Sequence, residues 1–161
     1  MVLAGLLKLV HVIASITLLA NFVLLVAWKA SADRAGTPAQ RAFVLDRVHA
    51  LDKRVTAWAG ILTFAAGYPI IRVLGLWGGS IAEAPWALAS LILMTLAGLA
   101  WYFVLLPLEV KMADAADREA AGAALDPAYA RWSGVWMAGV LAVVATVIAI
   151  AALMVFKPGA A

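Results

Sequence analysis

Long apolar stretches separated by short charged segments dominate the chain. Four such stretches cover residues of about 3–28, 55–77, 85–110 and 132–156. A helix of about 20 apolar residues crosses the hydrocarbon core of a bilayer, which is roughly 30 Å thick. The pattern therefore predicts an all-α fold: an integral membrane four-helix bundle, with residues 1–161 forming a single transmembrane domain.

The segments between the spans carry helix signals of their own. Gly36-Thr37-Pro38 is typical of a helix start, so we expect a helix from Pro38 that continues into the second span. Residues 111–131 are rich in alanine and charge, and predict a helical extension that breaks at Gly122. Asp126-Pro127 resembles an N-cap followed by a proline in the first helical turn.

The positive charges predict the orientation. Nine of the 12 lysines and arginines lie in or beside the first and third connections, and three lie on the other side. Positive residues accumulate on the cytoplasmic side. Both termini should therefore lie on the periplasmic side of a bacterial inner membrane. Tryptophans at the span ends suit interfacial belts, with Trp77 and Trp86 on the outer side and Trp28 and Trp132 on the inner side.

Composition narrows the class of protein. The chain is 66% hydrophobic and 13% charged, whereas a soluble domain carries about a quarter charged residues. It has no cysteine, which excludes disulfides, thiolate metal sites and thiol catalysis. The net charge is +3, but the basic residues flank the spans without forming a long run. They are topology signals, and we expect the lipid bilayer rather than nucleic acid as the partner.

The first span carries the main candidate for chemistry. Lys8, His11 and Ser15 are three and four residues apart, so they share one helical face, which we expect to point into the bundle. His11 would lie roughly 10 Å below the outer interface. A neutral imidazole there can bind a haem iron or another metal, or relay protons. The structural alternative is a histidine that hydrogen-bonds a neighbouring helix.

Two residues at the predicted depth of His11 complete a candidate haem site. Met94 in the third span would serve as a second axial ligand, and Arg72 in the second span would pair with a propionate. Each also has a structural interpretation, because methionine commonly fills gaps in packing and arginine can reach back to the interface.

His49 lies in a charged run, where Asp46, His49 and Lys53 share a helical face. The predicted topology places it at the opposite end of the bundle from His11, which argues against one haem held by both histidines. It is either a solvated interfacial residue, or a proton entry point or partner contact.

Motifs for catalysis are missing from the chain. It has no His-Glu-x-x-His motif, no glycine-rich phosphate loop and no cluster of carboxylates within a span, so no catalytic residues are predicted. The absence of a strip of charges within a span argues against an ion pump or a proton-driven transporter. Gly60, Gly67, Gly98 and Gly139 are expected to permit close helix approach.

Several stretches resemble a family of uncharacterised bacterial predicted integral membrane proteins: Leu6–Ile13, Trp101–Met112, Asp126–Trp132 and Leu153–Pro158. That family is distantly similar to HemJ-type protoporphyrinogen oxidases and to CopD-type copper-resistance domains. The first resemblance implies a haem-ligand histidine in a Lys-x-x-His motif, which Lys8 and His11 match. The lysine that HemJ-like proteins carry early in the third helix is absent here, as is the periplasmic Met/His cluster that copper binding would suggest.

Three functions follow from these observations. The first is an accessory subunit that packs against another membrane protein or a second copy of itself, which suits minimal loops and small-residue faces. The second is a haem b redox protein that uses His11, which would make the protein a haem-dependent oxidoreductase. The third is a permeability protein for a small solute or metal.

Overall fold

The computed structural model describes residues 2–73 and 84–158, except for the side chains of Arg72 and Val73. These residues form helices and connections and contain no strand, which confirms the all-α prediction for this part of the chain. In chain order the helices are α1 (Val2–Ala35), α2 (Pro38–Leu51), η1 (Asp52–Thr56), α3 (Ala57–Val73), α4 (Pro85–Ala100), η3 (Trp101–Leu105), α5 (Leu106–Ala120) and α6 (Tyr129–Phe156).

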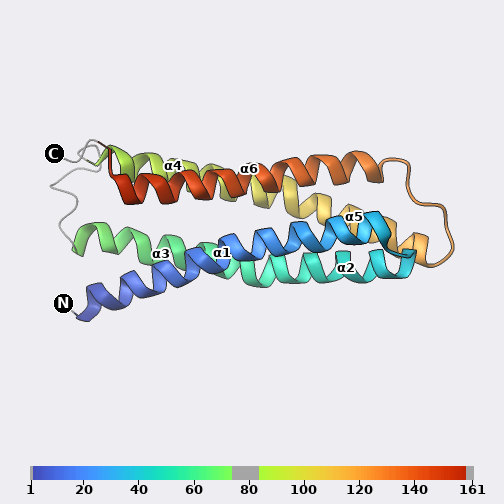
Figure 1. Cartoon of the computed structure of the whole chain (residues 1–161), viewed down its shortest axis with the longest axis horizontal. Coiled ribbons are helices and arrows are strands. Elements are labelled where there is room, and N and C mark those ends of the chain that lie inside the picture. The colour runs from blue at the N-terminus through green and yellow to red at the C-terminus, as the bar shows by residue number, and fades with distance from the viewer. Residues whose placement is uncertain (1, 74–83, 159–161) are drawn as a thin grey trace.

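These elements join into four antiparallel rods (Figure 1). α1 and α6 are single helices, α2 continues through η1 into α3, and α4 continues through η3 into α5. The first residues of α1 and the last residues of α6 lie at the same end of the bundle. α1, α6 and the rod from Pro85 to Ala120 are each long and apolar enough to cross a membrane. The predicted second span is described only as far as Val73, and the rest of it, including Trp77, lies outside the described residues.

Local signals explain where the helices begin and end. Thr37 caps α2: its hydroxyl accepts the N–H of Gln40, and the Gln40 side chain accepts the N–H of Thr37. Gly122 ends α5 with a φ of 97°, which suits glycine. Asp126 is not the N-cap of α6. The helix starts at Tyr129, and Asp126 accepts the N–H of Ala128 within the preceding turn.

The packing divides the bundle into two halves. In the half with the chain ends, α3 packs on α1 and α4 packs on α6, whereas α2 packs on α5 in the other half. The main apolar core includes Leu25, Leu45, Met112 and Trp136. Large apolar side chains cover the outside of the spans and are more than half exposed, as contact with lipid or with another membrane protein requires: Ile16, Val23, Trp58, Leu96, Phe103 and Ile148.

Trp86, predicted to lie in the outer interfacial belt, packs inside the bundle. It is buried at the start of α4, packs near Leu153 and Met154 of α6, and has the Lys157 ammonium over its ring. Trp28, by contrast, is 43% exposed, which suits an interfacial position.

Candidate functional site

Two acidic side chains meet inside the bundle where the spans give way to their helical extensions. Asp52, the first residue of η1, and Glu109, in the first turn of α5, are each 1% exposed. Their carboxyl groups are neighbours inside the bundle. Two charges about 4 Å apart repel by about 4 kcal/mol at an effective dielectric constant of about 20. The pair is therefore expected to carry one shared proton rather than two negative charges.

Two tryptophans fix the acid pair. The indole Nε1 of Trp101 donates to Asp52 Oδ2 at 2.6 Å, and that of Trp136 donates to Glu109 Oε1 at 2.9 Å. Among the described residues, Asp52 Oδ1 has no N–H or O–H donor. A proton between the two carboxyl groups would give this buried oxygen its partner.

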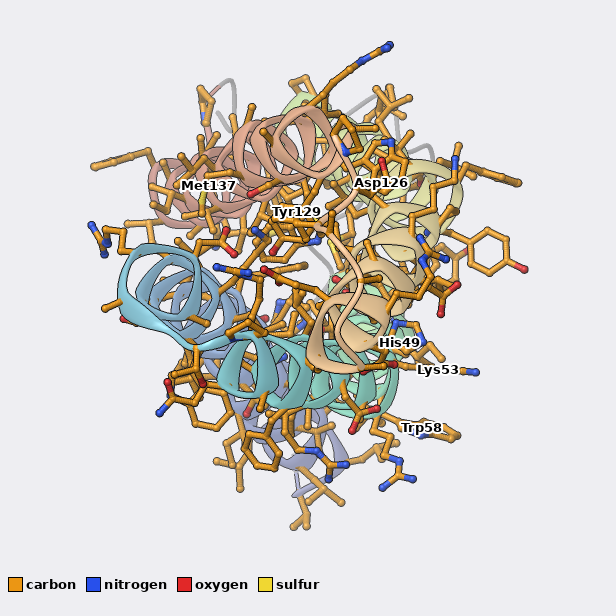
Figure 2. All side chains as sticks on the ribbon, turned by 90° about the vertical axis from the view of Figure 1, so that its right-hand side faces the viewer. His49, Lys53, Trp58, Asp126, Tyr129 and Met137 are labelled. Carbon is orange, nitrogen blue, oxygen red and sulfur yellow. The ribbon has the colours of Figure 1, made fainter. Side chains whose placement is uncertain are left out.

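His49 connects the pair to the outside. Its Nδ1 lies 3.1 Å from Glu109 Oε2, and its side chain is 28% exposed. Seen from the end of the bundle opposite the chain ends, His49 lies at the rim, while Lys53 and Trp58 point outward (Figure 2). An imidazole that touches both a buried carboxyl and the exterior can pass a proton between them.

Both walls of the site contain a wide helical turn. The N–H of Ala57 donates to the carbonyl of Asp52, and the N–H of Leu106 donates to that of Trp101, in each case five residues back. Pro107, which follows the second turn, has no N–H to donate, so the regular ladder is interrupted there. Such π-helical turns are frequent at functional sites, and here they carry Asp52 and the tryptophan that binds it.

A second buried network adjoins the acid pair. Lys29 is fully buried, and its Nζ lies 2.5 Å from both Asp33 Oδ2 and Ser133 Oγ. The same ammonium lies 5.5 Å from the ring centre of Tyr129 and 5.6 Å from that of Trp136. Trp136 therefore contacts both networks, with its N–H on Glu109 and its ring under Lys29.

The charges of this network are matched. The hydroxyl of Tyr129, which lies over the centre of the bundle in Figure 2, donates to Asp33 Oδ1 at 2.6 Å. Arg41 pairs with Glu119, which joins α2 to α5, and this hydrogen bond raises the pKa of the Arg41 guanidinium above its ordinary value. The network is thus a set of paired charges that holds the helical extensions together, whereas the ionisable neighbour of the acid pair is the imidazole of His49.

His11 contacts α3. Its Nδ1 lies 2.8 Å from the carbonyl oxygen of Thr63, and the Ser15 hydroxyl lies 3.5 Å from the Thr63 hydroxyl. Because a carbonyl only accepts, Nδ1 carries the proton, and Nε2 of the neutral ring keeps its lone pair. This contact is compatible with both interpretations of His11. Its Nδ1 bonds a neighbouring helix, and its Nε2 has the lone pair that a metal requires.

Lys8, Met94 and Arg72 are the other residues of the predicted haem site. Lys8 is exposed, and the side chain of Arg72 lies outside the described part of the structure. Met94 lines a cavity to which His11 does not contribute. In the described parts of the chain, no three His, Asp or Glu side chains are grouped so that they could hold a metal ion.

The four glycines predicted to permit close helix approach, Gly60, Gly67, Gly98 and Gly139, have two kinds of surroundings. A Cβ at Gly67 would lie 2.8 Å from the His11 ring, and one at Gly139 would lie 2.6 Å from Leu105. These two permit close approach, as predicted. The prediction is wrong for Gly60 and Gly98, because a Cβ at either would meet nothing within 4 Å.

Gly60 and Gly98 instead face a cavity of about 370 Å³. Its walls come from α3 and from the α4–η3 rod, and Leu18, Phe22, Val143 and Val147 of α1 and α6 add to the lining. Nearly all of its surface is apolar. Thr56 and Trp101 also line it, and both lie beside Asp52.

Sequence reasoning missed Asp52, Glu109, Trp101 and Trp136 as a group. Each carboxylate lies near the edge of an apolar stretch, where it resembles an ordinary interfacial charge. One signal was available: His49 and Asp52 are three residues apart on a helix that enters a span, so they share a face. Their partner on the third rod could not be identified without the packing.

A family model described as "Predicted integral membrane protein (DUF2269)" matches residues 5–158. No curated protein and no solved structure matches the chain. The family match confirms the prediction of an uncharacterised family of integral membrane proteins.

Proposed function

Since the chain belongs to the DUF2269 family of predicted integral membrane proteins, we propose that it is a proton-binding accessory subunit of a larger membrane complex. The observation that carries the proposal is the burial of two neighbouring carboxyl groups, those of Asp52 and Glu109, which are both 1% exposed. Ionisable groups within a membrane bundle are costly, so a retained pair is a functional candidate by default.

The surroundings of the pair suit proton exchange. The tryptophan N–H groups fix the carboxyl groups, but neither indole is a base that could compete for the proton. His49 reaches Glu109 from a partly exposed position, so the proton has a route to the exterior in the half of the bundle where α2 packs on α5. The paired charges around Lys29 hold the helices that form this route.

Deuterium exchange tests the route through His49. In D₂O the carbonyl stretching band of a protonated carboxylic acid shifts as its proton is replaced, and infrared spectroscopy follows the rate. We expect His49→Ala to slow this shift by about a hundredfold, the lower end of what a positioned proton-transfer side chain contributes. His11→Ala is the matched control, because His11 contacts α3 at Thr63 rather than the acid pair. Equal rates in both variants and the wild type would contradict the route.

Orientation and location form part of the proposal. The basic residues flank the end of the bundle where His49 lies, so this end would face the cytoplasm of a bacterium, with both termini in the periplasm. The acid pair would then exchange protons with the cytoplasm. A cysteine introduced at position 2 that reacts with an impermeant thiol reagent on intact spheroplasts would support this orientation.

The accessory role rests on the outer surface. Trp58, Tyr102 and Phe103 are 64%, 60% and 67% exposed on the rods that carry the acid pair. Large aromatic side chains are enriched where protein surfaces meet. Co-purification from native membranes with a constant partner supports the role, and recovery of the chain alone after mild solubilisation argues against it.

A haem b protein is the second candidate, and one observation favours it. The Nδ1–H of His11 donates to a backbone carbonyl, an arrangement that orients metal-binding histidines and leaves Nε2 available. His11 would supply one axial ligand. A Soret band in protein purified from its own membranes, lost in His11→Ala, would support this candidate, and a colourless preparation that stays colourless with added haem would refute it.

A further inference from the structure

The cavity beside the acid pair has the features of a ligand site. We infer that it binds a lipid-soluble ligand with a hydroxylated aromatic ring, the class that includes alkyl phenols and hydroquinones. Its volume of about 370 Å³ falls within the range of small-molecule sites, roughly 300–1,000 Å³. The inference rests on the proposed function in one respect, since the ring hydroxyl would meet the acid pair through Thr56.

The lining favours a ring over a lipid tail. Gly60 and Gly98 leave open space on two walls, where any side chain would narrow the cavity. Phe22, Phe64 and Trp101 present aromatic surface to the same space. Aromatic side chains gain more from an offset or edge-on ring than from contact area alone.

The polar end of the cavity explains why the ring should carry a hydroxyl group. Thr56 lines the cavity, is 4% exposed, and accepts a hydrogen bond from Asn21 Nδ2 at 2.8 Å. Its hydroxyl retains one donor and one further acceptor site. It can therefore bond a ligand hydroxyl and the Asp52 carboxyl beside it, which links the ligand to the shared proton.

Entry would be lateral, from the bilayer. α3 packs mainly on α1, and α4 packs mainly on α6, so the two walls of the cavity belong to different helix pairs. The outer surfaces beside the cavity are apolar and exposed at Ile61 and Leu96. A lipid-soluble ligand could therefore enter between the walls without crossing water.

Photolabelling of the full-length protein in lipid nanodiscs tests the inference. The probe is an alkyl hydroquinone with a diazirine on its tail, and a diazirine fatty acid of equal length is the lipid-tail comparison. The hydroquinone should label residues 56–65 and 94–101, and unlabelled alkyl hydroquinone should displace it. Labelling spread evenly over the lipid-facing surface would overturn the inference. So would fatty-acid labelling of the cavity that the hydroquinone does not displace.

Matched leucine variants sharpen the test. Gly98→Leu fills the cavity and should weaken hydroquinone binding by at least about tenfold, because an overpacked site excludes its ligand. Gly134→Leu adds the same side chain to an exposed position of α6 with nothing within 4 Å of the new Cβ, and should leave binding unchanged. Equal affinity in both variants would overturn the inference, and the displacement result on the wild type does not depend on how either variant folds.

A third variant tests the polar end. Thr56→Val keeps the shape but removes the hydroxyl, so it should weaken hydroquinone binding by about two- to tenfold and leave binding of the hydroquinone dimethyl ether unchanged. An equal loss for both ligands would overturn the role of Thr56. Binding is measured without reference to protonation, so failure here would leave the infrared test of the acid pair unaffected.

Discussion

Asp33→Ala is expected to lower the free energy of unfolding by about 3–5 kcal/mol, because removing one partner of a buried ion pair leaves the other charge uncompensated. Lys29, the partner, is fully buried and lies 2.5 Å from Asp33 Oδ2. Its remaining contacts are the Ser133 hydroxyl and two aromatic rings, which cannot replace a carboxylate. Unfolding in mixed micelles with increasing dodecyl sulfate measures the change.

Two comparisons isolate the cause. Asp46→Ala removes a carboxylate whose pair with Arg47 is more than half exposed on both sides, and it should cost no more than about 1 kcal/mol. The double variant Lys29→Met/Asp33→Ala removes both charges and should recover at least half of the lost stability. A double variant that is less stable than Asp33→Ala would contradict the claim that the unpaired ammonium causes the loss.

Glu109→Ala is expected to cost about 3–5 kcal/mol, for a different reason. The substitution leaves the Trp136 N–H and the Asp52 carboxyl without their partner and opens a cavity in the core. Glu109→Gln should cost no more than about 1 kcal/mol, because its amide oxygen can accept from Trp136 and its N–H groups can donate to Asp52 and His49. The same unfolding measurement compares the two variants.

The glutamine variant also tests the protonation of the pair. An amide resembles a protonated carboxyl group in shape and in having a donor beside an acceptor. If Glu109→Gln destabilises the protein as much as Glu109→Ala, a negative charge rather than a shared proton holds the site together.

The sequence was sufficient for the parts of the fold that depend on local pattern. Apolar length predicted membrane-crossing helices, and Thr37 and Gly122 marked a helix start and a helix end that the structure confirms. His11 and Ser15 do face the bundle, as their spacing on α1 predicted, but Lys8 of the same predicted face is exposed.

The acid pair depends on tertiary packing, which the pattern does not encode. Asp52 and Glu109 come from different rods, and each alone is a common charge near a membrane boundary. A strip of charges within a single span was the feature sought in the sequence, so a pair formed between two rods was not considered. His49 was considered alone for the same reason, and its contact with Glu109 is the observation on which the proposed proton route rests.

The glycines show the same limit. Gly60, Gly67, Gly98 and Gly139 look alike in an apolar helix, but two face close neighbours and two face the cavity. Whether a glycine faces a close neighbour or the cavity depends on how the helix pairs cross. A glycine in an apolar helix is compatible with both arrangements.

The protonation of the acid pair is the central claim, and one infrared spectrum tests it most directly. The wild-type protein at neutral pH should show the carbonyl band of one protonated carboxylic acid that shifts in D₂O. The band should be lost in the double variant Asp52→Asn/Glu109→Gln. A wild-type spectrum that contains only ionised carboxylates, or a band that persists unchanged in this variant, would contradict the account.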